Sequence, residues 1–303
     1  MITKGKASLL VLIGAASYGV LSTIVKLGYQ DGFTAAEITG SQAAAGCLIM
    51  WLLRLFISDK AEINWAMRLK LLGSGTFTGL TGVVYYYSLQ MLDASLAILL
   101  LFQFIWMGMA VDWVFYKRRP GATQWLSVAI ILSGTLLASG MAEHSPVSVR
   151  LAGIALGLLA AVCCTAFIYF SGHVAVNLPA VQRSSWMLTG AAVTVMLIYP
   201  PQFLWNGSLG SGLWLWALLL SVLGNIVPPY LLAIGAPRIG TGAAAMLCAV
   251  ELPVVIVCSG LFLHESTSWL QWLGIFIIMA GVSVSKIINL MLKKASHTKE
   301  HAA

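Results

Sequence analysis

The chain has 303 residues, of which 59% are hydrophobic and only 9% are charged. A soluble domain carries about 25% charged residues, and a disordered chain combines low hydrophobicity with high charge, so the composition excludes both classes. The net charge of +7 is spread along the chain beside apolar segments, which argues against a nucleic-acid partner. The sequence therefore predicts an integral membrane protein.

Ten apolar segments follow one another, each close to the roughly 20 residues that a helix needs to cross a bilayer. We place them at residues 7–28, 35–57, 69–91, 94–116, 122–141, 151–172, 184–205, 213–235, 239–263 and 268–290. Every Lys and Arg except Lys26 and Arg150 falls on one side when the N-terminus is placed in the cytoplasm. By the positive-inside rule, we expect an all-α integral membrane protein with ten transmembrane helices and both termini in the cytoplasm.

The sequence repeats itself at about half its length. Trp125, Leu126, Ile130, Ile131 and Gly134 recur with the same spacing from Trp272 to Gly281, an offset of 147 residues, and the run from Ala94 matches the run from Gly242 at an offset of 148. Five helices per copy is an odd number, so the second copy must enter the membrane from the opposite side. We expect two inverted five-helix repeats at residues 1–141 and 150–290, followed by a basic cytoplasmic tail at 291–303.

Three motifs of the second half support a family assignment. They are Glu251-Leu252-Pro253, the Gly-Leu-Phe-Leu-His-Glu stretch ending at Glu265, and the segment Trp272–Gly281. Through the order and spacing of these motifs, the chain resembles the EamA-type members of the drug/metabolite transporter superfamily. The resemblance implies ten helices in two domains and the export or exchange of small metabolites, such as amino acids, or of drugs. The first half departs from the pattern, because it has Gln103-Phe104-Ile105 where the second has Glu251-Leu252-Pro253.

Glu251 is the strongest candidate for a functional residue. It is the only acid near the centre of an expected span, where an ionised side chain costs about 2.5–3.5 kcal/mol, so we expect it to face the interior of the bundle. It would serve in proton coupling or bind a substrate amine; the alternative is a protonated glutamate that only joins two helices. Cys248 lies on the same helical stripe, one turn earlier.

Other polar or helix-breaking residues at membrane depth complete the candidate site. Asn225 precedes Pro228 and Pro229, which cannot donate to the carbonyls four residues earlier, so we expect a kinked, site-facing or gating helix; a kink that serves packing alone is the alternative. The further candidates are Tyr18, Tyr86, Gln103 and Trp106 as substrate-binding or coupling residues and Pro253 as a third kink.

Small-residue and capping patterns have structural explanations. Gly75 and Gly79 form a GxxxG pair, which usually allows close helix contact, and Thr34 and Glu37 have capping-box spacing. The five cysteines all lie in apolar runs without metal-ligand spacing to histidine, so we expect no metal and no cofactor.

The function that we predict is secondary transport of a small molecule by alternating access, in a bacterial plasma membrane. No GxxxxGK phosphate loop is present, so active transport would draw on an ion gradient. The alternatives are a passive channel and, more remotely, an intramembrane enzyme, which would need a motif such as HExxH or a nucleophile with its base. The sequence leaves open the substrate, the direction, coupling to protons and the formation of a homodimer.

Overall fold

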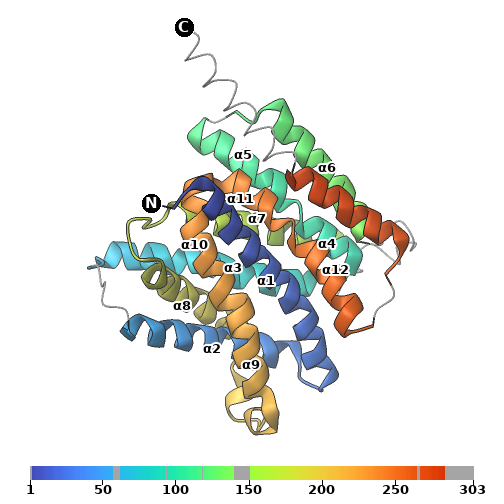
Figure 1. The fold of residues 1–303 in the computed structure, drawn as a ribbon. Helices are drawn as coiled ribbons and strands as arrows, with labels where there is room; N and C mark the ends of the chain where they lie inside the picture. The colour runs from blue at the N-terminus through green and yellow to red at the C-terminus, as the bar shows by residue number, and fades with distance from the viewer. Residues whose placement is uncertain are drawn as a thin grey trace.

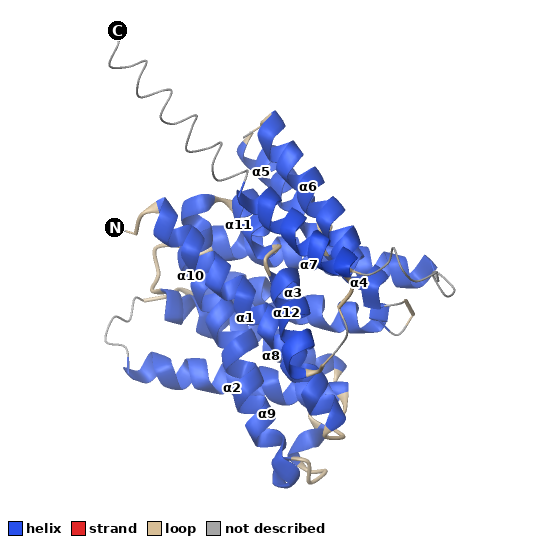
Figure 2. Cartoon of the chain, turned by 45° about the vertical axis from the view of Figure 1, so that its right-hand side comes forward, coloured by secondary structure: helices blue, strands red, loops and turns tan. Residues whose placement is uncertain are grey.

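The computed structural model describes residues 2–56, 62–89, 91–92, 94–117, 119–139, 151–264 and 267–283. All regular structure in these ranges is helical, without a strand (Figure 2). The motif residue Glu265 and the tail 291–303 lie outside the described residues. The first half comprises α1 Lys4–Gln30, α2 Ala35–Phe56, α3 Trp65–Leu89, α4 Ala94–Leu101, α5 Phe104–Tyr116 and α6 Ala122–Ala138.

The second half begins with two long helices and continues in shorter pieces (Figure 1). Its elements are α7 Leu151–His173, α8 Ala180–Ile198, the 3-10 turn η1 Gln202–Leu204, the π-helical turn η2 Leu209–Leu213, α9 Trp214–Leu220, the π-helical turn η3 Ser221–Ile226, α10 Val227–Ile239, α11 Thr241–Cys248, α12 Glu251–Phe262 and a last helix Trp269–Ser283.

The outer surface of the bundle is suited to lipid. Within the described residues, six segments are long and apolar enough to cross a membrane: Lys4–Gln30, Ala35–Phe56, Leu96–Phe115, Leu151–His173, Leu209–Ile239 and Thr241–Phe262. Two further apolar helices, α6 and Trp269–Ser283, are shorter. Large apolar side chains such as Leu197 and Phe276 are 79% and 69% exposed, an arrangement that only an apolar solvent tolerates over a wide surface.

One predicted helix is too long. The sequence predicts a helix over 184–205, but α8 ends at Ile198. The next residues include Pro200 and Pro201, which lack the N–H that helical hydrogen bonding requires. The chain instead continues through η1 and η2, and within η2 Gly212 has a φ of 108°, a value that favours glycine.

Two helices that we predict as continuous lose their regular α-helical hydrogen bonding for two residues at equivalent places. Gln103, Ala249 and Val250 keep right-handed helical φ and ψ values, but the backbone bonds there join residues three apart; we call these two places the helix breaks. The predicted helix 94–116 is divided between α4, which ends at Leu101, and α5, which begins at Phe104. The predicted helix 239–263 is divided between α11, which ends at Cys248, and α12, which begins at Glu251. The offset between the two breaks equals the 147 residues of the sequence repeat, so the discontinuity is a property of the repeat.

The two halves pack tightly against each other. Helix α1 lies against α10, α11 and α12, and α3 lies between α7 and α8. A Cβ placed on Gly75 would overlap the backbone carbonyl of Met187, which confirms the close contact predicted from the GxxxG pair. Helix α6 lies beside Trp269–Ser283 (Figure 1), and a Cβ on Gly134 would come within 2.8 Å of the backbone nitrogen of Ile278. Small residues thus determine where the helices cross.

Arg183 joins three helices of the second half, a role that sequence analysis does not predict. Its side chain is 1% exposed and donates to the carbonyl of Ala233 in α10 at 2.8 Å and to the carbonyl of Ser171 in α7. Pro237 stands four residues after Ala233 and has no N–H, so the Ala233 carbonyl lacks its helical partner. Arg183 supplies that missing donor.

Candidate functional site

A cavity of about 220 Å³ lies inside the bundle. Its walls come from both halves, and its lining includes five residues predicted from the sequence: Tyr18, Tyr86, Asn225, Cys248 and Glu251. The polar residues that the prediction omitted are Thr39, Gln42, Thr78, Thr81 and Cys164. Leu101 and Phe104 line it from the break between α4 and α5. The cavity is therefore an apolar space with a few polar groups, as small-molecule sites usually are.

Among the described residues that line the cavity, Glu251 is the only acidic or basic side chain. It begins α12, directly after the break that follows Cys248. Tyr18, Tyr85, Cys164 and Cys248 lie close enough to interact with its carboxylate electrostatically. Within the part of the chain that the structure describes, no group donates a hydrogen bond to this carboxylate. The wall of the cavity therefore holds an acid that is not neutralised by a lysine or arginine.

The helix breaks place two equivalent pairs of residues on the cavity wall. Leu101 and Phe104 occupy the positions in the first half that Cys248 and Glu251 occupy in the second, and all four line the cavity. In the sequence motifs, Gln103 corresponds to Glu251 at an offset of 148. In the structure the counterpart of Glu251 is Phe104 instead, because the two helix breaks are 147 residues apart.

Gln103 and Trp106 lie outside the cavity lining. The Gln103 amide donates to the carbonyl of Leu99 at 3.0 Å, and the Trp106 indole donates to the Gln103 amide oxygen at 2.9 Å. Trp106 is 36% exposed. These two side chains bond to each other and to the Leu99 carbonyl outside the cavity lining, so the structure does not bring them together with Glu251.

Asn225 is held beside Gln42 across the interface between the two halves. The Asn225 amide donates to the backbone carbonyl of Gln42 at 3.0 Å, and the Gln42 amide donates to the Asn225 side-chain oxygen at 3.3 Å. A Cβ on Gly46 would lie 2.7 Å from the Cβ of Asn225, so glycine at that position permits the approach. The sequence signal that could have identified Gln42 is that it is the only side-chain amide within the predicted span 35–57.

The prolines shape the backbone next to Asn225. Pro228 and Pro229 are buried in the first turn of α10, and the preceding six residues form the π-helical turn η3. Ser17 of α1 donates to the carbonyl of Leu223 in this turn at 2.6 Å. Pro253 is likewise buried in the first turn of α12, after the break. The structure thus places all three prolines in the first turn of a helix that follows irregular backbone.

Hydroxyl groups line the part of the cavity near Tyr86. Tyr86 lies close to the hydroxyl groups of Tyr29 and Thr39. Its neighbour Tyr87 stacks on Tyr199 instead, with ring centroids 6.3 Å apart. Consecutive helical residues point in different directions, and only Tyr86 of the three adjacent tyrosines lines the cavity.

A second set of polar contacts ties the turn between α1 and α2 to the segment between α8 and α9. Glu37 accepts hydrogen bonds from the backbone N–H and the hydroxyl of Thr34, both at 2.8 Å, as the capping-box spacing predicts. It also accepts from the Asn206 amide at 2.6 Å and from the Ser208 hydroxyl. The Trp216 indole donates to Asp31 at 3.2 Å. These contacts hold the two halves together at one end of the bundle.

Asp112 joins the halves at another point. It lies in α5, and its carboxylate accepts from the backbone N–H groups of Thr241 at 3.3 Å and Gly242 at 2.8 Å. These N–H groups belong to the first residues of α11, so the acid caps a helix N-terminus, where negative charge is favourable.

No group of His, Cys, Asp and Glu residues in the described ranges is arranged to hold a metal ion.

Comparisons with known proteins agree on the family. The model of the EamA-like transporter family matches residues 5–140 and 151–286. The threonine/homoserine exporter RhtA of Escherichia coli is 27% identical over 272 residues, which cover 88% of this chain and 85% of the exporter. The exporter of the same name from Salmonella typhimurium is 26% identical over 82% of this chain and 80% of its own length.

A solved crystal structure shares the fold. It covers 96% of this chain and 99% of its own length with a TM-score of 0.77, at 15% sequence identity. The match to the family model in both halves spans nearly the whole chain, and the related proteins are transporters rather than enzymes. The chain therefore belongs to the EamA-like transporter family and is a membrane transporter of small molecules.

Proposed function

We propose that this protein is a secondary transporter that exports or exchanges small amine-bearing metabolites, amino acids or related compounds, through the cavity beside Glu251. The observation that carries the proposal is the carboxylate of Glu251 on the wall of a cavity between the two halves, without a lysine or arginine among the described residues of the lining. A protonated amine would neutralise that carboxylate and form a charge-assisted hydrogen bond with it, which is stronger than a neutral one.

The other polar groups of the lining suit the rest of such a substrate. Tyr86, Thr39 and the amides of Gln42 and Asn225 offer uncharged donors and acceptors. Phe104 adds an aromatic face, which attracts a cation within about 6 Å of the ring. A small amino acid with a polar side chain fits this combination, and the name of RhtA identifies that relative as an exporter of threonine and homoserine.

The proposal includes the membrane topology. Ten helices cross a bacterial plasma membrane as two inverted five-helix repeats, at residues 1–141 and 150–290, with both termini in the cytoplasm. The helix breaks at equivalent positions of the two halves support the repeat. Broken helices near the midplane are also where inverted-repeat transporters place their substrate sites.

Alternating access is the mechanism that we propose. The irregular backbone before Pro228 and Pro253 is where we expect one half to move relative to the other. The contacts of Glu37 with Asn206 and Ser208 and of Asp112 with the start of α11 join the halves at separate points. Each set must open in one of the two states. Protonation of Glu251 in the absence of substrate would couple this cycle to a proton gradient.

The experiment is amino-acid counterflow in proteoliposomes, with threonine and homoserine first in a panel of small amines and amino acids. Gly82 lines the cavity, and a Cβ at that position meets no atom within 4 Å. Gly82→Leu should therefore fill the cavity without disturbing the packing and abolish saturable uptake. Gly5→Leu is the matched control, because Gly5 is equally unobstructed and lies at the start of α1.

Counterflow also separates the carrier from a passive channel, the second candidate. A carrier with alternating access shows uptake of labelled substrate that is stimulated by unlabelled substrate inside the vesicles, whereas a channel does not. Stimulation by internal substrate supports the carrier. Unsaturable uptake that is indifferent to internal substrate would establish the channel instead.

A further inference from the structure

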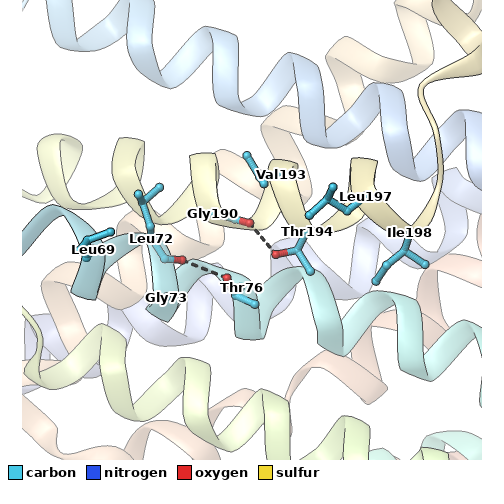
Figure 3. A pocket seen from close by; sticks show the side chains of 9 residues that line it. All are labelled: Leu69, Leu72, Gly73, Thr76, Gly190, Val193, Thr194, Leu197 and Ile198. Carbon is cyan, nitrogen blue, oxygen red and sulfur yellow. Dashed lines mark hydrogen bonds between the residues drawn. The ribbon is translucent and has the colours of Figure 1, made fainter.

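A groove of about 580 Å³ runs along the outside of the bundle between α3 and α8. Figure 3 shows its walls, which come from four residues of α3 and five of α8 and share none with the central cavity: Leu69, Leu72, Gly73 and Thr76, and Gly190, Val193, Thr194, Leu197 and Ile198. The two helices lie side by side here over several turns. The groove is therefore a separate feature that transport through the cavity does not explain.

The surface of the groove is apolar. The hydroxyl of Thr76 donates to the carbonyl of Leu72 at 3.3 Å, and that of Thr194 donates to the carbonyl of Gly190 at 2.8 Å. Both hydroxyls are thus directed back to their own helices, as the dashed lines in Figure 3 show. Val193 and Leu197 are 52% and 79% exposed. A long hydrocarbon chain has the shape and polarity that this groove accepts.

Two arginines and a tryptophan lie beyond the end of the groove that is marked by Leu69. Arg68 immediately precedes Leu69 in α3, and its guanidinium carbon lies 5.5 Å from the ring centroid of Trp186. Trp186 is one turn before Gly190 in α8. Arg54 of α2 approaches the same ring at 6.0 Å and the ring of Trp51 at 4.6 Å. Two positive charges therefore share one aromatic ring at the end of an apolar groove.

The donors of this cluster are incompletely used. The Nη1 atom of Arg54 and the indole nitrogen of Trp186 are buried and have no hydrogen-bond partner. Among the residues that the structure describes, no carboxylate forms an ion pair with Arg54 or Arg68. Buried donors normally have an acceptor, and two neighbouring guanidinium groups repel each other unless an anion lies between them. The cluster has the composition of an anion site, since arginine pairs geometrically with phosphate oxygens.

We propose that the groove and the arginine cluster together bind one anionic phospholipid. One of its acyl chains lies between α3 and α8, and its phosphate lies at the arginine cluster, where it pairs with the guanidinium groups of Arg54 and Arg68. The topology proposed above places these arginines at the cytoplasmic surface, where anionic headgroups attract basic residues. Trp65, which is 65% exposed at the start of α3, then lies at the depth where tryptophan is enriched. The site does not depend on what the cavity transports.

The test is lipid binding to the delipidated full-length protein, followed by native mass spectrometry. The probes are dioleoyl phosphatidylglycerol and dioleoyl phosphatidylcholine, which share their acyl chains and differ in headgroup charge. We expect phosphatidylglycerol to bind more tightly. Because a basic residue at a membrane surface contributes about 1 kcal/mol, Arg54→Gln and Arg68→Gln should each weaken that binding about fivefold, whereas Arg68→Lys should retain most of it.

The acyl-chain part of the site has its own variant. A Cβ on Gly73 meets no atom within 4 Å, so Gly73→Leu should fill the groove without disturbing the helices and weaken the binding of both lipids. Arg238→Gln is the charge control, because Arg238 is exposed and donates to the carbonyl of Ile234 in its own helix. Gly5→Leu is the control for an added side chain. Neither control should alter the affinity.

Three outcomes would overturn the proposal. The first is equal binding of the two lipids to the wild-type protein. The second is full displacement of the lipid by inorganic phosphate together with unchanged binding to Gly73→Leu, which would establish a site for a free anion only. The third is a lipid-free dimer that dissociates in Gly73→Leu, which would show that a second copy of the chain occupies the groove.

Discussion

The buried contacts of Arg183 give a stability prediction that can be worked out from single hydrogen bonds. Its guanidinium donates to the carbonyls of Ala233 and Ser171, and its side chain is 1% exposed. Arg183→Leu would leave both carbonyls buried without this donor, at about 1–3 kcal/mol each. Relief from burying a charge offsets part of this cost. We expect a net loss of about 2–4 kcal/mol in the free energy of unfolding.

Pro237 offers a direct check of that explanation. Pro237→Ala restores a backbone N–H four residues after Ala233, so the Ala233 carbonyl regains a helical donor. In that background Arg183→Leu should cost about 1 kcal/mol less than in the wild type, the value of one net hydrogen bond. The assay is equilibrium unfolding in mixed detergent micelles, analysed as a double-mutant cycle. Equal costs in the two backgrounds would refute the role that we assign to Arg183.

Three further predictions concern contacts between the halves. Gly75→Ala should lower the free energy of unfolding by about 1–3 kcal/mol because its Cβ would overlap the Met187 carbonyl, whereas Gly73→Ala, two residues earlier in open space, should raise it by about 0.5–1 kcal/mol; thermal melting in detergent compares the two. Asn225→Ala breaks both hydrogen bonds to Gln42 and should cost about 1–2 kcal/mol while also reducing counterflow; unchanged stability and flux would contradict the role of this pair. Asp112→Asn removes the negative charge at the start of α11 and should cost about 0.3–1 kcal/mol at low salt, a difference that high salt should diminish in the same unfolding assay.

Much of the fold is predictable because lipid imposes a strong constraint on sequence. Apolar runs near 20 residues predict the helices, and the spacing from Trp125 to Gly134 and from Trp272 to Gly281 predicts the repeat. The error at 184–205 has a definite cause. The apolar run continues through Pro200 and Pro201 to Trp205 and therefore extends beyond the end of α8 at Ile198. The helix ends because of these prolines and not because the sequence becomes polar.

The helix breaks illustrate a different limit. Phe102 and Gln103 interrupt the first half without glycine or proline at the break, so no local signal marks it. The equivalent break before Glu251 is followed by Pro253, but proline in the first turn of a helix is compatible with several backbone paths. The sequence near Leu101 and Cys248 therefore does not mark where α4 and α11 end.

The residues of the cavity wall that are conspicuous in an apolar run could be predicted from the sequence, and the inconspicuous ones could not. Tyr18, Asn225 and Glu251 stand out by polarity, and the structure places them on one cavity. Gln103 is equally polar, but its amide donates to the carbonyl of Leu99. Its neighbour Phe104 lines the cavity instead, because consecutive side chains of a helix point about 100° apart. Gln42 was not singled out, since nothing near it in sequence shows that it lies beside Asn225.

The most direct test of the transport proposal is counterflow of the best substrate by wild-type protein and Glu251→Gln in matched proteoliposomes. The substitution keeps the size of the side chain and removes the charge that we expect to hold the substrate amine. A hydrogen bond to a charged group contributes about 1.5–3 kcal/mol, so saturable counterflow at low substrate concentration should fall by roughly 10- to 100-fold while the melting temperature stays near that of the wild type. Undiminished counterflow by a folded Glu251→Gln protein would contradict the account, because the cavity would then bind its substrate without the acid on its wall.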